Sequence, residues 1–146
     1  IEETQARLEE GDVQQLEERA TEVYSELELA QMDTPLTYTV TLSTDDDILW
    51  VWGWCAATEE ILADNLAEIE LNFTLDGESI SSEQFANFGY PYQEQSCQVY
   101  FASLYEWPVG EHHLNTTASW GSVLNDGAME FPAGSQIYEY TVFVSP

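Results

Sequence analysis

The hydrophobic pattern of this chain changes its period at Pro35. Upstream of the proline, apolar residues recur every three or four positions, which predicts a helix that ends at Pro35. Downstream, residues 36–42 alternate apolar residues with threonine, which predicts a strand with one buried face. We therefore expect an N-terminal helix or stalk in residues 1–34, of which residues 1–11 could be frayed, and a β domain in residues 35–146.

The next segments limit the fold further. Residues 48–54, Ile-Leu-Trp-Val-Trp-Gly-Trp, are apolar on both faces, as expected of a strand between a core and a covering element. A short helix at residues 58–67, with Thr58 as its N-cap, could cover the second face of this strand. Turn residues separate further predicted strands at 69–75, 97–105, 113–120 and 137–144, and a long connection is predicted at 79–94. This pattern predicts a mainly β chain folded as an antiparallel β-sandwich.

The predicted N-terminal helix carries one amphipathic stripe. Asp12 and Gln15 have the spacing of a capping box at its start. The stripe, in steps of three and four, consists of Val13, Leu16, Ala20, Val23, Leu27 and Ala30. It is shorter than the roughly three or four heptads that predict a coiled coil. The helix could join copies of the chain into a homo-oligomer, or it could pack on its own domain or act as a stalk.

The charge of the chain excludes one class of partner. The 146 residues include 28 acidic residues and only two basic ones, Arg7 and Arg19, for a formal net charge of −26. Such a surface repels nucleic acids and anionic membranes, so we expect no nucleic-acid partner. No apolar run is long enough to cross a bilayer, and we expect no membrane insertion by this segment. The chain does not begin with methionine, which suggests that an export signal or anchor has been removed.

The two cysteines, Cys55 and Cys97, suggest a cellular compartment. An even pair in an acidic chain favours a disulfide formed in an oxidising compartment, and therefore an extracellular or cell-surface location. The bridge would close a loop of about 43 residues and stabilise the fold by roughly 4 kcal/mol. Two buried thiols in a reducing compartment remain the alternative, and a zinc site is weaker because no Cys-x-x-Cys spacing or histidine cluster completes it.

A run of carboxylates is the stronger of two candidate metal sites, and Asn125 with Asp126 is the weaker one. Asp45, Asp46 and Asp47 fall in a predicted turn, where they repel one another unless they are solvated or hold a hard cation. Calcium would suit an irregular oxygen-rich loop, although a solvated turn that blocks edge pairing is the favoured explanation. No other cofactor is expected. His112 and His113 are adjacent, so on a strand they would point to opposite faces and would not readily bind one metal together.

The aromatic residues fall into two groups. Trp50, Trp52 and Trp54 share one strand face and are expected in the core. Tyr90, Tyr92 and Trp107 lie in predicted loops, where exposed rings beside amides and carboxylates are suited to binding sugars. They could equally contact a protein. Loop aromatics that only cap the sandwich are the favoured explanation.

A family resemblance rests on residues 53–69, Gly-Trp-Cys-Ala-Ala-Thr-Glu-Glu-Ile-Leu-Ala-Asp-Asn-Leu-Ala-Glu-Ile, and on Phe-Thr-Leu-Asp-Gly at 73–77. These segments resemble an uncharacterised family of secreted bacterial proteins and lipoproteins. Trp-Pro-Val-Gly-Glu-His at 107–112 and the turns at 125–127 and 132–134 are similar to the closing segments of that family. The resemblance leaves out the N-terminal helix. It implies an exported immunoglobulin-like domain with a bridged cysteine pair, and it transfers no functional residue because the family has no established activity.

These observations predict a noncatalytic, exported module that binds or assembles at the cell surface or outside the cell. No nucleophile motif is present, so an enzyme is not expected. The partner would be a surface protein, a glycan or a second copy of the chain. One alternative is a carbohydrate-binding module that uses Tyr90, Tyr92 and Trp107. Another is a secreted hydrolase with an unrecognised pair of carboxylates.

Overall fold

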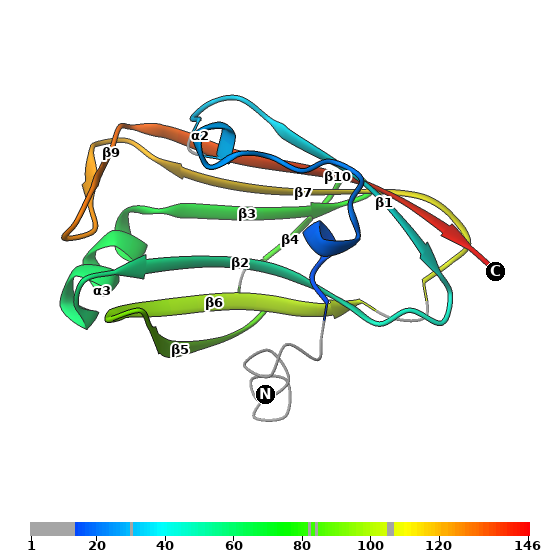
Figure 1. The fold of residues 1–146 in the computed structure, drawn as a ribbon, viewed down its shortest axis with the longest axis horizontal. Helices are drawn as coiled ribbons and strands as arrows, with labels where there is room; N and C mark the ends of the chain where they lie inside the picture. The colour runs from blue at the N-terminus through cyan, green and yellow to red at the C-terminus, as the bar shows by residue number, and fades with distance from the viewer. Residues whose placement is uncertain (1–13, 30, 82, 84, 105–106) are drawn as a thin grey trace.

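The computed structural model describes residues 14–146 except residues 30, 82, 84, 105 and 106. These residues form two facing β-sheets (Figure 1). The larger sheet has the strand order β1 (Leu36–Ser43), β10 (Gly134–Ser145), β7 (Gly110–Trp120), β3 (Glu70–Leu75) and β4 (Glu78–Ile80). The smaller sheet has the order β2 (Ile48–Ala56), β6 (Gln95–Leu104) and β5 (Ala86–Tyr92). The predicted β-sandwich is confirmed.

The remaining elements are short and lie at the margins of the sheets. They are the 3₁₀ helix η1 (Leu16–Arg19), the one-turn helix α2 (Glu26–Leu29), the helix α3 (Glu59–Glu68), and a small hairpin of β8 (Leu124–Asn125) and β9 (Glu130–Phe131).

The partition of strands between the sheets is of the immunoglobulin type. The smaller sheet holds β2, β5 and β6, which correspond to strands B, D and E, and the larger sheet holds β3, β7 and β10, which correspond to C, F and G. The first strand, β1, does not take the place that strand A has in the four-stranded ABED sheet of an immunoglobulin domain. Here β1 runs parallel to β10, with Leu36 beside Tyr138, and does not pair with β2. As a result, β2 is an edge strand of the smaller sheet.

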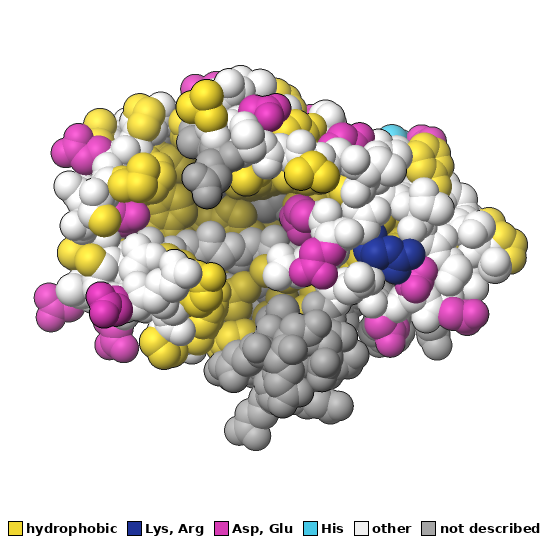
Figure 2. All heavy atoms as spheres, viewed as in Figure 1, with side chains coloured by type: hydrophobic (Ala, Val, Ile, Leu, Met, Phe, Trp, Pro, Cys, Tyr) yellow, Lys and Arg dark blue, Asp and Glu magenta, His cyan; other side chains and the backbone are white. Residues whose placement is uncertain are grey.

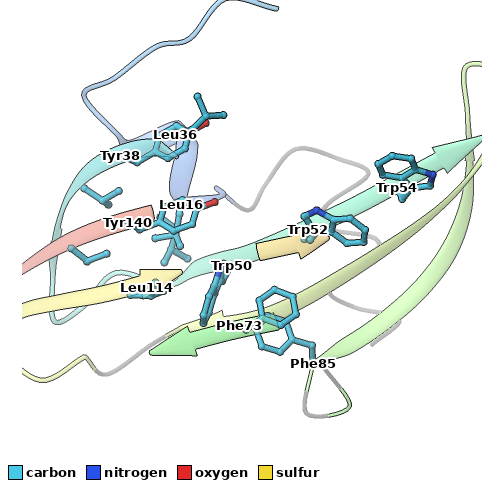
Figure 3. Close-up of a cluster of buried hydrophobic side chains, with 14 of the residues drawn as sticks. Leu16, Leu36, Tyr38, Trp50, Trp52, Trp54, Phe73, Phe85, Leu114 and Tyr140 are labelled. Atoms are coloured by element: carbon cyan, nitrogen blue, oxygen red, sulfur yellow. The ribbon is translucent and has the colours of Figure 1, made fainter. Parts of the chain in front are cut away.

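An aromatic core holds the two sheets together (Figure 3). Trp50, Trp52 and Trp54 of β2 are all buried in it, as predicted. The indole Nε1 of Trp50 donates a hydrogen bond to Thr116 Oγ1 of β7 at 2.8 Å, so this ring spans the sandwich. Phe73 meets Trp50 edge to face, with the ring centroids 5.3 Å apart. Large aromatic side chains bury the most apolar area per residue, which is why they dominate the stability of a small sandwich.

The chain before β1 does not form the predicted continuous helix. Its described residues comprise η1, α2 and an extended segment between them. Gln15 forms a parallel bridge to Leu49 of β2, and Ala20 forms an antiparallel bridge to Val40 of β1. Backbone groups that a helix would have paired internally are therefore paired with the edges of the two sheets.

The apolar stripe is divided accordingly. Leu16 is 0% exposed, whereas Val23 is 92% exposed and Leu27 is 78% exposed. The prediction that these residues share one helix face is wrong, because burial of Leu16 in the core outweighs the weak preference of the segment for a helix. Val13 and Ala30 lie outside the described residues. Since Ala20 and Tyr24 also pack against the core, this segment belongs to the sandwich, not to a separate stalk before residue 35.

The predicted connection at 79–94 contains a strand that the sequence pattern concealed. Gly89 and Pro91 disfavour a strand, yet both are accommodated in β5 because it is the other edge of the smaller sheet. Tyr90 and Tyr92 therefore lie on a strand and not in a loop.

The inserted helix forms where predicted but covers a different surface. The Thr58 side chain accepts a hydrogen bond from the backbone N–H of Ile61 at 3.2 Å and caps α3. Leu62 and Asn65 are buried, and Trp54 Nε1 donates to Asn65 Oδ1 at 3.0 Å. The buried side of α3 therefore packs on the core at one end of the sandwich, and the outward face of β2 has no cover from this helix.

Candidate functional site

The outward face of the smaller sheet is apolar and aromatic. Because side chains alternate along a strand, the residues between the core-facing positions point away from the core. Phe88, Tyr90 and Tyr92 of β5 lie on this side together with Val99 and Phe101 of β6. We call these five residues the outer apolar face. Val99 and Phe101 are buried but are not members of the central core cluster.

The aromatic rings of β5 form a row along the outer apolar face. The ring centroids are 5.8 Å apart for Phe88 and Tyr90, and 6.5 Å apart for Tyr90 and Tyr92. Tyr92 is 54% exposed. Partial burial, together with the neighbouring Tyr92, raises the pKa of the Tyr90 phenol. A hollow of about 610 Å³ lies beside these rings and reaches Val51 and Gly53 at the edge of β2.

The disulfide lies on the same side of the sheet. Cys55 of β2 and Cys97 of β6 are directly opposite in the strand register, and they are bonded, with their Cα atoms 4.0 Å apart. The predicted disulfide is confirmed. It joins two neighbouring strands of one sheet, unlike the bridge between sheets in antibody domains.

The outward face of the larger sheet is polar by comparison. Along β1, Thr37, Thr39 and Thr41 alternate with buried apolar residues. Glu139 and Thr141 of β10 lie beside two of these threonines. An antiparallel sheet with one solvated side ordinarily shows this pattern, so the apolar character of the other sheet is the exception.

Trp107 does not join the predicted aromatic platform. It is only 6% exposed, and its ring lies 5.4 Å from that of His112. It follows the last residues of β6, whereas Tyr90 pairs with Cys97 near the first residues of that strand. The prediction that Tyr90, Tyr92 and Trp107 form one ligand-binding surface is therefore wrong, because β6 separates them along its length.

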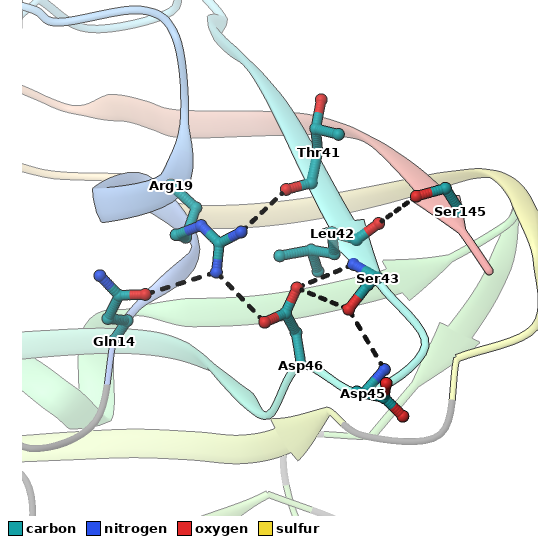
Figure 4. A network of polar contacts seen from close by, with 8 residues as sticks. All are labelled: Gln14, Arg19, Thr41, Leu42, Ser43, Asp45, Asp46 and Ser145. Atoms are coloured by element: carbon teal, nitrogen blue, oxygen red, sulfur yellow. Dashed lines mark hydrogen bonds and ion pairs between the residues drawn. The ribbon is translucent and has the colours of Figure 1, made fainter.

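The predicted calcium ligands do not converge. Asp46 accepts hydrogen bonds from the backbone N–H and the hydroxyl of Ser43 at 2.8 and 3.3 Å, and it pairs with Arg19 at 3.4 Å (Figure 4). The Ser43 backbone bond contributes most to a lowered pKa of the Asp46 carboxyl, and Arg19 lowers it further. Asp45 and Asp47 are exposed. Among the residues that the structure describes, no group of three or more His, Cys, Asp or Glu side chains is placed to hold a metal ion.

The two histidines occupy different environments. His112 is half-buried, and its ring nitrogens lie 2.9 Å from Asp76 Oδ2 and 2.8 Å from the carbonyl oxygen of Pro108. Two acceptors favour the doubly protonated ring, and the bond to Asp76 is the main reason that the pKa of His112 is raised. His113 is exposed and contacts Glu111 at 2.8 Å.

A second hollow, of about 340 Å³, opens between the two sheets on the inner side of β2. Figure 2 shows hydrophobic side chains lining this recess. Its lining includes Glu17 of η1, Trp52 of β2, and Tyr138 and Tyr140 of β10. Glu17 is not a member of the predicted apolar stripe, and no sequence signal indicated this site. We call it the inner hollow.

Among the residues that the structure describes, Glu17 is the one carboxylate that lines the inner hollow. Its Oε1 accepts a hydrogen bond from the Tyr140 hydroxyl, and its Oε2 is buried with no hydrogen-bond partner within the described part of the chain. Burial raises the pKa of the Glu17 carboxyl, although the bond from Tyr140 acts in the opposite direction. Burial and the nearby carboxylate also raise the pKa of the Tyr138 and Tyr140 phenols.

Comparisons of the chain with protein-family models, curated proteins and solved structures found no match, and the family resemblance stays a prediction. None of the helices in the described ranges is long and apolar enough to span a membrane.

Proposed function

We propose that this chain is a noncatalytic module of an exported protein and that it binds another protein through the outer apolar face. The contrast between the two outward faces of the sandwich carries this proposal. A polar face such as that of β1 is stable in water, whereas exposed apolar surface gains free energy when a partner covers it. The row of rings on β5 lies outside the central core: Phe88 packs on the buried Phe101, whereas Tyr92 stays 54% exposed and offers apolar surface to a partner.

The chemistry of the face favours a protein over a glycan. Phenylalanine and tyrosine are enriched at protein interfaces, and charged residues are depleted from the centres of interfaces. Within the described ranges, the hollow beside the rings offers only Gln15 and the hydroxyls of Tyr90 and Tyr92 as polar side-chain groups. A sugar needs several convergent hydrogen-bonding groups to fix its orientation.

The disulfide and the charge support export and an unlike partner. Disulfides persist in oxidising compartments, which fits a secreted or surface-exposed chain. A net charge of −26 opposes the approach of a second copy. Contact between copies through the exposed Val23 and Leu27 is a separate prediction, which light-scattering mass of wild type and a Leu27→Ser variant would test.

Capture from the surface and secreted proteins of the source organism tests the proposal. We expect the wild-type chain to capture a discrete protein, and the purified protein to bind again in isolation. The double variant Tyr90→Ser, Tyr92→Ser should lose this binding. Phe143→Ser is the matched control, because Phe143 is an exposed ring that points outward from the larger sheet and should not affect binding.

Three outcomes would contradict the proposal. Binding that survives loss of both tyrosines would place the interface elsewhere. Binding to a polysaccharide panel that is lost in the double variant would identify a carbohydrate-binding module. Turnover of any member of that panel would identify a hydrolase.

A further inference from the structure

The edge of β2 that faces away from β6 is hydrogen-bonded at two points, Leu49 and Ala57, and its backbone groups between them have no partner among the described residues. The Leu49 N–H donates to the carbonyl oxygen of Gln14 at 3.0 Å, and the Ala57 N–H donates to that of Asp126 at 2.7 Å. Both bonds point away from β6. The residues in between, 51–55, extend over roughly 14 Å of strand. We call this stretch the open edge.

Two observations fix the direction of the backbone groups in the open edge. In an antiparallel pair, alternate residues direct both the N–H and the C=O either toward the partner strand or away from it. Leu49 directs its N–H away from β6. Cys55 and Cys97 are opposite one another with a short Cα separation of 4.0 Å, which is typical of a pair without mutual hydrogen bonds. Val51 and Gly53 lie two and four residues after Leu49. Their backbone N–H and C=O groups therefore also point away from β6.

Nothing in the described part of the chain pairs with the open edge. The bridge of Gln15 to Leu49 is parallel, so a continuation of that pairing toward Val51 would need residues 16–19 in extended form. Those residues form η1, and Leu16 turns into the core. Among the described residues, none therefore takes the position beside β2 that strand A occupies in an ABED sheet.

A hollow lies on each side of the open edge. The outer hollow, of about 610 Å³, and the inner hollow, of about 340 Å³, both include Val51 and Gly53 in their linings. An added strand directs alternate side chains to opposite sides of the sheet, so it would place one set in each hollow. This combination of free main-chain groups and alternating pockets is the general requirement for binding by strand addition.

The inner hollow determines the chemistry of one of the inserted side chains. The buried Oε2 of Glu17 lacks a hydrogen-bond partner among the described residues, which is costly unless a ligand supplies a donor. The aromatic rings of Trp52 and Tyr138 also line this hollow, and aromatic faces attract cations. A lysine or arginine side chain would donate a hydrogen bond to Glu17 and would place its positive charge beside the rings.

We propose that the open edge of β2 accepts an extended segment of another protein as an added strand, with a basic side chain in the inner hollow and apolar side chains in the outer hollow. This inference rests on the proposed function, because the partner is a protein and the outer hollow is lined by rings of the outer apolar face, and it adds main-chain pairing along β2 and contacts in the inner hollow. A second copy is a poor donor of such a segment, because the chain has only two basic residues and Arg19 is paired with Asp46.

Selection of random dodecapeptides displayed on phage against the full chain supplies the probe. In the enriched peptides, alternate side chains should fall into two sets. The set that faces the inner hollow should include a basic residue, and the set that faces the outer hollow should be apolar. In the free protein, the amide hydrogens of Val51, Gly53 and Cys55 should exchange rapidly with solvent, while those of Trp52 and Trp54, which point toward β6, should be protected. A synthetic copy of an enriched peptide should slow exchange at the three edge amides.

A pair of modified peptides and a pair of protein variants separate strand addition from other modes of binding. An N-methyl group on a peptide residue that faces β2 should weaken binding by about tenfold, whereas the same group one residue further along should have little effect. Glu17→Gln should reduce the preference for the basic peptide over its glutamine analogue. Glu18→Gln, which changes an exposed neighbouring carboxylate, should leave that preference unchanged.

The inference fails if no peptide is enriched, if bound peptides leave the three edge amides unprotected, or if both N-methyl positions are equivalent. Peptides that leave these amides unprotected but lose binding in the Tyr90→Ser, Tyr92→Ser variant would support the proposed function and overturn strand addition. If peptides protect the amides but the captured protein still binds the Tyr90→Ser, Tyr92→Ser variant, strand addition would be supported and the proposed function overturned.

Discussion

Replacing Leu16 with alanine tests whether the segment before β1 is part of the sandwich. Leu16 is 0% exposed and lies in the core, so the substitution removes buried methyl groups and leaves a cavity. Substitutions of this kind cost about 2–5 kcal/mol in the free energy of unfolding. Leu27 provides the matched control, because it belongs to the same predicted stripe but is 78% exposed. Leu27→Ala should change stability by no more than about 0.5 kcal/mol.

Urea unfolding monitored by tryptophan fluorescence measures the difference. A loss of about 3 kcal/mol, with a denaturant dependence of about 2 kcal/mol per molar urea, lowers the midpoint by roughly 1.5 M. The midpoint of Leu27→Ala should coincide with that of wild type. Equal effects of the two substitutions would mean that both leucines lie on one exposed or one buried helix face, and the packing of η1 in the core would be refuted.

Three further predictions follow from the disulfide and from two titrating groups. Replacing both cysteines by serine should cost about 4 kcal/mol by the chain-entropy relation for a separation of 42 residues, measured by urea unfolding; an unchanged midpoint would contradict this. Burial raises the pKa of the Glu17 carboxyl above 4.5, so its contribution to stability is full below pH 4.5 and is lost as pH rises through the raised pKa. Glu17→Gln should therefore be more stable than wild type near pH 7 but not near pH 4, and an identical difference at both pH values would refute the burial of this carboxylate. The pKa of His112, followed by NMR, should lie above 6.5 and fall in Asp76→Asn, because the bond to Asp76 is the largest cause of the shift; a pKa unaffected by this substitution would rule out the pair.

The pH range in which the His112–Asp76 pair stabilises the fold follows from its two shifts. The raised pKa of His112 gives a contribution that is full below pH 6.5 and is lost as pH rises through the raised value. The lowered pKa of Asp76, caused first by the bond to His112, gives a contribution that is present above pH 3.8 and is lost as pH falls through the lowered value. The pair is therefore most effective between about pH 3.8 and 6.5.

Local features of the sequence predicted most of the regular elements. Alternation of apolar and polar residues marked β1, a continuous apolar run marked β2, and Thr58 marked the start of α3. These signals are local, because strand period and helix capping depend on residues within a few positions of one another. The sites were harder to predict. Trp107 was a candidate for an exposed binding surface and is buried, and the carboxylate of Asp46 is bound by Ser43 and Arg19.

By itself, the sequence determined the sandwich class, the tryptophan-rich core and the strongly negative charge, because period, apolar content and ionisable groups are properties of the residues themselves. Only the tertiary structure decided that Leu16 enters the core, that β5 forms a strand despite Pro91, and that β2 is an edge strand of its sheet. Each of these depends on which distant backbone or side chain lies alongside, as Gln14 does for Leu49. Such pairings are selected by the total burial and hydrogen bonding of the fold, and residues far apart in the chain carry no local sign of them.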